Sequence, residues 1–137
     1  MNLFVDTSVW SLALRRDGGS ATPEVARLRE ALVSQQPLFT TGLVLQELLQ
    51  GFRGPKARDA IVERFAALAM IIPGRDDHIA AAQIRNTCRR RGVQIGTIDA
   101  LLMQLCIRHG LAMLSCDADF RHAARHVPLK HWQAHTL

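Results

Sequence analysis

The chain has 137 residues and a mass of 15.2 kDa, a size at which roughly 68–70% of the unfolded surface is buried on folding. Hydrophobic residues make up 48% and charged residues 21%, which excludes an intrinsically disordered chain. No apolar run approaches the roughly 18 residues of a membrane-spanning helix, and the N-terminus does not look like a signal peptide. We therefore expect a single domain over residues 1–137 in the cytoplasm, with no membrane partner.

The charge balance is basic. The formal net charge is +5, and 15 of the 17 basic residues are arginines. Because a guanidinium group can pair two donors with phosphate oxygens, a polyanion is the first partner to consider; a basic surface that only confers solubility is the alternative. The three cysteines, Cys88, Cys106 and Cys116, show no CxxC spacing. We expect them to be small buried hydrophobic residues, without disulfides or a cysteine zinc site.

The first half of the chain alternates short apolar runs with helical patterns. Residues 3–5 are all apolar and predict a strand buried on both faces. A helix capped by Thr7 or Ser8 follows, and Pro23 suits the first turn of a second helix that ends near Ser34. The next elements that the pattern predicts are a strand over 37–40 and helices over 42–51 and from 55 to about 68.

The second half continues the alternation. The helix over 97–109 has the clearest 3.6-residue repeat, and Gly110 is placed to end it. The other predicted elements are strands over 70–72, 112–114 and 127–130 and a helix from 76 to 91. Strands that alternate with helices indicate a parallel sheet covered on both faces. The expected architecture is a three-layer α/β/α fold around a short sheet of four to five strands.

Four carboxylates lie near the predicted strand ends: Asp6, Glu47, Asp99 and Asp117. In a parallel sheet the carboxyl ends of the strands share one edge, where ligands bind. Each aspartate taken alone has a simpler interpretation as a helix cap or a turn former. Glu47 is harder to explain in that way, because its helix has an apolar arc and offers it no basic residue three or four positions away.

Brought together, these carboxylates predict a cation site. Several carboxylates at one point repel each other unless some are protonated or a divalent ion neutralises them. Ligation by oxygen alone, without histidine or cysteine, points to Mg²⁺ or Mn²⁺. An acidic, metal-binding pocket within a basic protein suits a polyanion that is cut at a phosphodiester, because a metal ion activates water and stabilises charge on the phosphate.

Four segments carry a family resemblance: residues 4–8 (FVDTS), 45–48 (LQEL), 96–102 (GTIDALL) and 110–120 (GLAMLSCDADF). With these motifs in this order, the chain resembles the PIN-domain nucleases, and specifically the VapC-type toxins of type II toxin–antitoxin systems. The resemblance implies one PIN domain over residues 1–137. It also implies that the chain is an Mg²⁺- or Mn²⁺-dependent endoribonuclease that hydrolyses RNA with a metal-activated water.

The resemblance also implies roles for individual residues. Asp6 and Asp99 would be the primary metal ligands, and Asp117 and Glu47 would complete the catalytic pocket directly or through water. The supporting residues would be hydroxyl residues that orient the ligands (Thr7, Ser8 and Thr97) and Asp119, which we interpret as a turn former rather than a ligand. The implied partners are an RNA substrate, a cognate VapB-type antitoxin and a second copy of the chain in a homodimer.

Arginines outside the pocket are candidates for contact with substrate phosphate. Arg121 and Arg125 follow Asp117 closely and are the preferred candidates. Arg85 and residues 89–91 form a second basic cluster, which either contacts RNA or only stabilises the C-terminus of its helix. The alternative function is a non-catalytic RNA-binding or scaffold module with a PIN-like fold. The four retained acids argue against it, because clustered negative charge is costly without a use.

Overall fold

The structure is a computed structural model that describes residues 1–15 and 22–134. Within these residues, five strands and seven helices follow one another along the chain. They are β1 (Leu3–Val5), α1 (Thr7–Ala13), α2 (Pro23–Val33), β2 (Leu38–Thr41), α3 (Gly42–Gly51), α4 (Pro55–Ala66), β3 (Ala69–Ile71), α5 (Arg75–Arg90), α6 (Thr97–His109), β4 (Ala112–Leu114), α7 (Ala118–Ala123) and β5 (Lys130–His131). No helix among them is long and apolar enough to cross a membrane.

The strands form one parallel sheet in the order β3-β2-β1-β4-β5. Leu3 of β1 is in register with Leu38 on one side and Ala112 on the other. Every residue of β1 and β4 is fully buried, which confirms the prediction that residues 3–5 form a strand covered on both faces. The sheet therefore has its most protected strands at its centre, as expected for parallel sheets.

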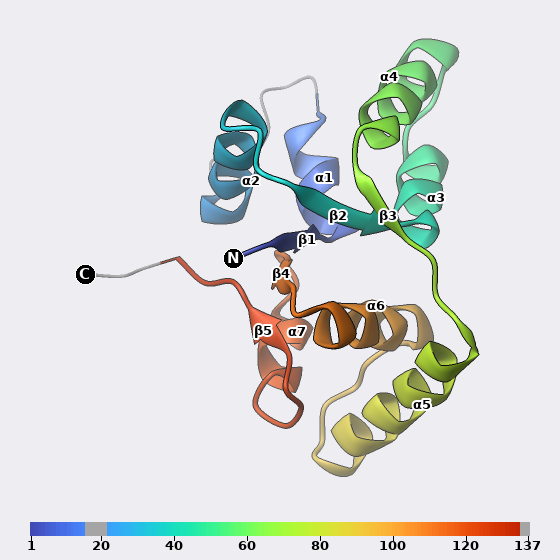
Figure 1. The fold of residues 1–137 in the computed structure, drawn as a ribbon, viewed down its shortest axis with the longest axis vertical. Helices are drawn as coiled ribbons and strands as arrows, with labels where there is room; N and C mark the ends of the chain where they lie inside the picture. Colours follow the sequence, from blue (N-terminus) through green and yellow to red (C-terminus); the bar gives the residue numbers. More distant parts are fainter. Residues whose placement is uncertain (16–21, 135–137) are drawn as a thin grey trace.

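Two groups of helices cover the sheet. Figure 1 shows α1 to α4 on one side of the strands and α5 to α7 on the other. Connections between parallel strands are nearly always right-handed. The chain steps outward from β1 to β2 to β3, which places α1 to α4 on one face, and then returns past β1 to β4, which places α5 and α6 on the other. This arrangement is the three-layer α/β/α fold that the sequence predicts.

An aromatic contact joins two of the helices, and a glycine ends a third. The indole of Trp10 in α1 packs against the ring of Phe65 in α4, with centroids 5.1 Å apart. The predicted stop of α6 is confirmed, because Gly110 has a φ of +64°, a left-handed conformation that glycine adopts at little cost. β4 can then begin two residues later and run directly beside β1.

Three expectations are corrected by the structure. The segment after β4 does not end in a simple turn, since it continues into the short helix α7. The last strand lies at Lys130–His131 rather than 127–130, because Pro128 has no N–H for the ladder and Leu129 N–H bonds the carbonyl of Val127 instead. Cys88 and Cys106 are buried as expected, whereas Cys116 is exposed.

Candidate active site

The fold brings Asp6 and Asp117 to the same edge of the sheet. Asp6 directly follows β1, and Asp117 follows β4 after two residues; these strands are neighbours in register. The chain leaves β1 toward one face of the sheet and β4 toward the other (Figure 1). The carboxyl ends of neighbouring strands that diverge in this way are the usual ligand position in parallel α/β sheets.

Two serine hydroxyls hold the carboxylate of Asp6. The side chain of Asp6 is 7% exposed, and its Oδ2 accepts hydrogen bonds of 2.8 Å from both Ser8 Oγ and Ser115 Oγ. Asp6 occupies the N-cap position of α1 but makes no capping hydrogen bond with its side chain. The simpler interpretation of Asp6 as a helix cap is therefore wrong, since its carboxylate is fixed by hydroxyl groups at the strand ends.

The same hydroxyls join the loops after β1 and β4. Ser8 Oγ accepts the backbone N–H of Cys116 at 3.1 Å, and Ser115 Oγ accepts that of Asp117 at 3.0 Å. Sequence reasoning expected a supporting role for Ser8 but missed Ser115. Its signal is its position, the first residue after a fully buried strand, two residues before an acidic candidate.

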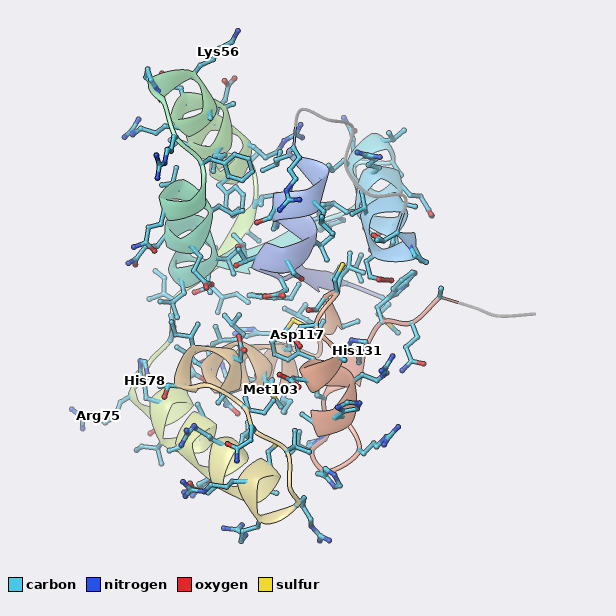
Figure 2. The ribbon with its side chains drawn as sticks, turned by 180° about the vertical axis from the view of Figure 1, so that it is seen from behind. Lys56, Arg75, His78, Met103, Asp117 and His131 are labelled. Atoms are coloured by element: carbon cyan, nitrogen blue, oxygen red, sulfur yellow. The ribbon has the colours of Figure 1, made fainter. Side chains whose placement is uncertain are left out.

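Asp117 begins α7 and is part-buried. Its Oδ1 accepts the backbone N–H of Asp119 at 2.9 Å, which caps the helix. Asp119 is exposed in the first helical turn. One oxygen of Asp117 is thus used by the local fold, while Figure 2 shows its side chain between the two groups of helices.

Glu47 approaches the site from α3. Its Oε1 accepts a hydrogen bond of 3.0 Å from Thr7 Oγ1, although 40 residues separate the two in sequence. On the same helix Val44 and Leu48 are buried, but Glu47 is exposed. The expectation that Glu47 needs a partner because it borders a buried face is therefore corrected: solvent and the Thr7 hydroxyl stabilise it.

The pKa of Asp99 is raised by burial and by the charges of the other acids. It lies part-buried in the first turn of α6, beside the exposed Thr97. Burial raises the pKa of Asp99 to about 6, and the negative charges of Asp6, Asp117, Glu47 and Asp119 contribute in that order. Four acids that are far apart in sequence, two that follow β1 and β4 and two that lie on α3 and α6, therefore share one electrostatic environment.

The donor chemistry of this cluster fits a hard divalent cation. All of its charged groups are carboxylates, and every charge that raises the pKa of Asp99 is negative. Oxygen-only donor sets of this kind favour Mg²⁺ or Mn²⁺. In the side-chain positions of residues 1–15 and 22–134, however, no three His, Cys, Asp or Glu groups converge closely enough to hold a metal ion. Metal binding therefore requires carboxylates to turn inward about their side-chain torsions, toward a cation that offsets their repulsion.

The two candidate arginines of the α7 region diverge. Arg121 lines a hollow together with Asp117, Glu24 and His131, and Figure 2 shows Asp117 and His131 near each other. Arg125 instead lines a separate groove together with Asp119. Burial, followed by the charge of Arg121, lowers the pKa of His131. The two arginines therefore face different surroundings.

The repulsion within the cluster leads to a stability prediction. Without metal at pH 7.5, Asp99→Asn is expected to raise the free energy of unfolding by about 1–2 kcal/mol, because the charge that the neighbouring acids oppose is removed. A pKa of about 6 against an ordinary 3.8 would correspond to about 3 kcal/mol, and solvent screening at this part-exposed site reduces it. Urea unfolding in EDTA measures the difference.

The pH dependence has a definite sign. Because the pKa of Asp99 is raised on folding, the folded state is penalised above about pH 6, and the penalty disappears as the pH falls below the unfolded value. The advantage of Asp99→Asn should therefore shrink from pH 7.5 to pH 4.5. Asp59→Asn, an exposed acid on α4, is the control and should change little. A loss of stability in Asp99→Asn would instead indicate a structural role for that carboxylate.

Comparison with known proteins agrees with this geometry. Residues 3–126 match the family model of the PIN domain. Ribonuclease VapC11 of Mycobacterium tuberculosis is 30% identical over 125 residues, which cover 90% of this chain and 92% of that protein. A relative from Mycobacterium bovis with the same identity and coverage is also named a VapC ribonuclease.

Solved structures share the fold. VapBC2 of Rickettsia felis bound to a promoter DNA fragment superposes with a TM-score of 0.73 at 16% identity, covering 97% of this chain and all of that chain. VapC20 of M. tuberculosis, a toxin that cleaves the sarcin-ricin loop, superposes with a TM-score of 0.65 at 23% identity, covering 93% and 98%. The acids near the β1–β4 edge thus lie in a fold shared with VapC toxins, and the chain belongs to the PIN-domain family, among its VapC ribonucleases.

Proposed function

We propose that this nuclease hydrolyses RNA phosphodiester bonds with Mg²⁺ or Mn²⁺ bound by its acidic cluster. Asp6 and Asp99 are the primary ligands in this proposal, and Glu47 and Asp117 complete the pocket directly or through water. The observation that carries it is the position of Asp99, whose pKa is raised to about 6 first by burial and then by the negative charges of the other acids. Such a concentration of negative charge is costly unless a cation uses it.

The chain's own residues prepare this pocket. Ser8 and Ser115 hold Asp6 Oδ2 and leave Oδ1 as the oxygen to face a cation. Thr7 holds one oxygen of Glu47 in the same way, and Thr97 stands in the turn that carries Asp99. When bound, a divalent ion supplies Lewis-acid stabilisation of the phosphate and lowers the pKa of water. The hydroxyl residues thus hold part of the ligand set in place, and the turning of the carboxylates toward the cation completes it.

The proposed substrate is single-stranded or loop RNA. The basic composition favours a polyanion, and the relatives are named ribonucleases, one of the structural neighbours being a toxin that cleaves an RNA loop. Arg125, exposed in the turn after α7, is proposed to contact substrate phosphates. Arg121, the other arginine named from the sequence, is not, because the hollow that it lines holds the carboxylates of Glu24 and Asp117. Asp119 lies exposed in the first turn of α7, where Asp117 accepts its backbone N–H, and it is proposed to begin that helix rather than to bind metal.

A cognate VapB-type antitoxin and a second copy of the chain are the proposed protein partners. The antitoxin is supported by the solved structures with this fold, several of which are VapBC complexes. The homodimer is supported by exposed apolar side chains near α5 and α6, of which Ile72, Ile79 and Ile98 are 80%, 54% and 42% exposed. The single domain over residues 1–137 and the cytoplasmic location stay predictions.

Metal dependence tests the proposed function. The purified protein, freed of antitoxin, is expected to cleave structured RNA when Mg²⁺ or Mn²⁺ is added and to stop when EDTA removes the metal. Gel analysis of labelled RNA measures both, and Ca²⁺ serves as a control cation with looser oxygen coordination. RNA binding without cleavage under any metal would favour the alternative, a non-catalytic RNA-binding or scaffold module.

A further inference from the structure

A basic groove lies beside the acidic cluster, on the side of the sheet that carries α5 and α7 (Figure 1). It has a volume of about 490 Å³, within the range of ligand-binding clefts. Two segments line it, the turn after α5 and the region of α7. The residues are Arg91, Gly92, Val93, Gln94, Asp119, His122, Arg125 and His126.

The turn after α5 sets the position of Arg91. Gly92 has a φ of +80°, which favours glycine, and the N–H groups of Gly92 and Val93 bond back to the carbonyls of Arg89 and Cys88. This pattern ends the helix and turns the chain toward α6. Arg91 is therefore presented at a rigid corner rather than along the helix.

The other arginines of the α5 cluster are used locally. Arg85 Nε donates to the carbonyl of Ile95 at 2.8 Å, and Arg89 and Arg90 donate to Asn86 and Thr87 of their own helix. Within residues 1–15 and 22–134, neither Arg91 nor Arg125 has a side-chain hydrogen bond or ion pair, and both are exposed. Two guanidinium groups thus remain available at one groove.

The charge balance separates this groove from the hollow around Arg121. In the groove, two guanidinium groups and two imidazoles face a single carboxylate, that of Asp119. In the hollow, the single guanidinium of Arg121 faces two carboxylates, those of Glu24 and Asp117. A phosphate chain is attracted to the first environment and repelled from the second. Asp119 joins the groove to the catalytic cluster, because its charge acts on Asp99.

We propose that the groove between the α5–α6 turn and α7 binds the phosphate backbone of the RNA strand next to the cleaved bond, through Arg91 and Arg125. This inference rests on the proposed function and assigns separate roles to Arg121 of α7 and to Arg125 of the turn that follows it. Arg125 binds the strand, whereas Arg121 lies outside its path. Contacts of this type anchor any sequence, so the groove positions RNA without selecting bases.

Binding in EDTA tests the groove without cleavage. Fluorescence anisotropy of a labelled 20-nucleotide single-stranded RNA is followed from 50 to 200 mM KCl. Arg91→Gln and Arg125→Gln are each expected to raise Kd about three- to tenfold at low salt, and each should reduce the slope of log K against log salt by about 0.7. Arg121→Gln on α7 and Arg58→Gln on α4 are matched controls with the same loss of charge and should change Kd less than twofold.

Several outcomes would overturn the proposal. Equal losses in all four variants would show attraction to net charge only, and unchanged binding in the two groove variants would show that RNA does not use the groove. Tighter binding of duplex DNA through the same arginines would assign the groove to a different polymer. In Mg²⁺, the groove variants should raise KM with little change in kcat. If wild type binds RNA through the groove but never cleaves it, the proposed function fails while the groove assignment stands.

Discussion

Asp6→Asn and Asp99→Asn are each expected to lower kcat for metal-dependent RNA cleavage by about a thousandfold. The reason is that each removes a primary charged ligand, and a catalytic metal supplies several kcal/mol of stabilisation in the transition state. Both variants should fold. An asparagine at position 6 keeps an oxygen that can accept the hydrogen bonds from Ser8 and Ser115, and an asparagine at position 99 relieves repulsion. Multiple-turnover cleavage with saturating RNA measures kcat, and single-turnover cleavage with excess protein measures the rate constant of the cleavage step itself.

The control variant distinguishes the loss of a carboxylate in the acidic cluster from the loss of any carboxylate on the protein. Asp59→Asn removes a carboxylate that is exposed on α4 and paired with Arg58, so its cleavage rate should match wild type. Circular dichroism verifies that all three variants are folded. Cleavage that continues at the wild-type rate in both Asp6→Asn and Asp99→Asn would exclude these residues from catalysis, even if the chain is an active ribonuclease.

Asp77→Ala is expected to lower the free energy of unfolding by about 2–4 kcal/mol, the largest loss of stability that we predict. Asp77 is 1% exposed and accepts hydrogen bonds from the backbone N–H of Gly74, from Gln104 Nε2 and from Arg108 Nη1. It thereby joins the start of α5 to α6, the helix that carries Asp99. Removing the carboxylate leaves the part-buried donors of Gly74, Gln104 and Arg108 without this partner and breaks an ion pair whose acidic member is buried, which is costly. Urea unfolding at pH 7 measures the change.

The pH dependence of this contribution is opposite to that of Asp99. The Gly74 N–H is the main influence that holds the pKa of Asp77 below 3.8, against the effect of burial, and Gln104 and Arg108 lower it further. The carboxylate therefore stabilises the fold above about pH 4, and this stabilisation is lost as the pH falls through the folded-state pKa. The difference between wild type and Asp77→Ala should shrink below pH 4. Asp76→Ala, the exposed neighbour, is the control and should cost no more than about 0.5 kcal/mol. An equal loss in both variants would contradict a specific role for the buried carboxylate.

Predictions from the sequence failed where local patterns compete. Asp6 and Asp117 both precede helices and look alike as candidate caps. Only Asp117 caps with its side chain, because Ser8 and Ser115 direct the Asp6 carboxylate elsewhere. The helix α7 was missed because six residues are too few to show a helical repeat. Glu47 was expected to need a partner because it borders the apolar arc of its helix. The buried side of that helix is formed by Val44 and Leu48, and the Glu47 side chain is exposed.

The sequence by itself determined the alternation of strands and helices, the buried central strands and the identity of the four acids. These features follow from the apolar periodicity and from residue chemistry, which act over a few residues. Only the tertiary structure decided that Ser115 holds Asp6 across 109 positions, that Asp77 is buried against α6, and that Arg121 and Arg125 face different surroundings. The physical reason is that hydrogen bonding, burial and electrostatic repulsion depend on distance in space. The crossover from β3 to β4 places β4 beside β1, and this brings together side chains that are far apart in sequence.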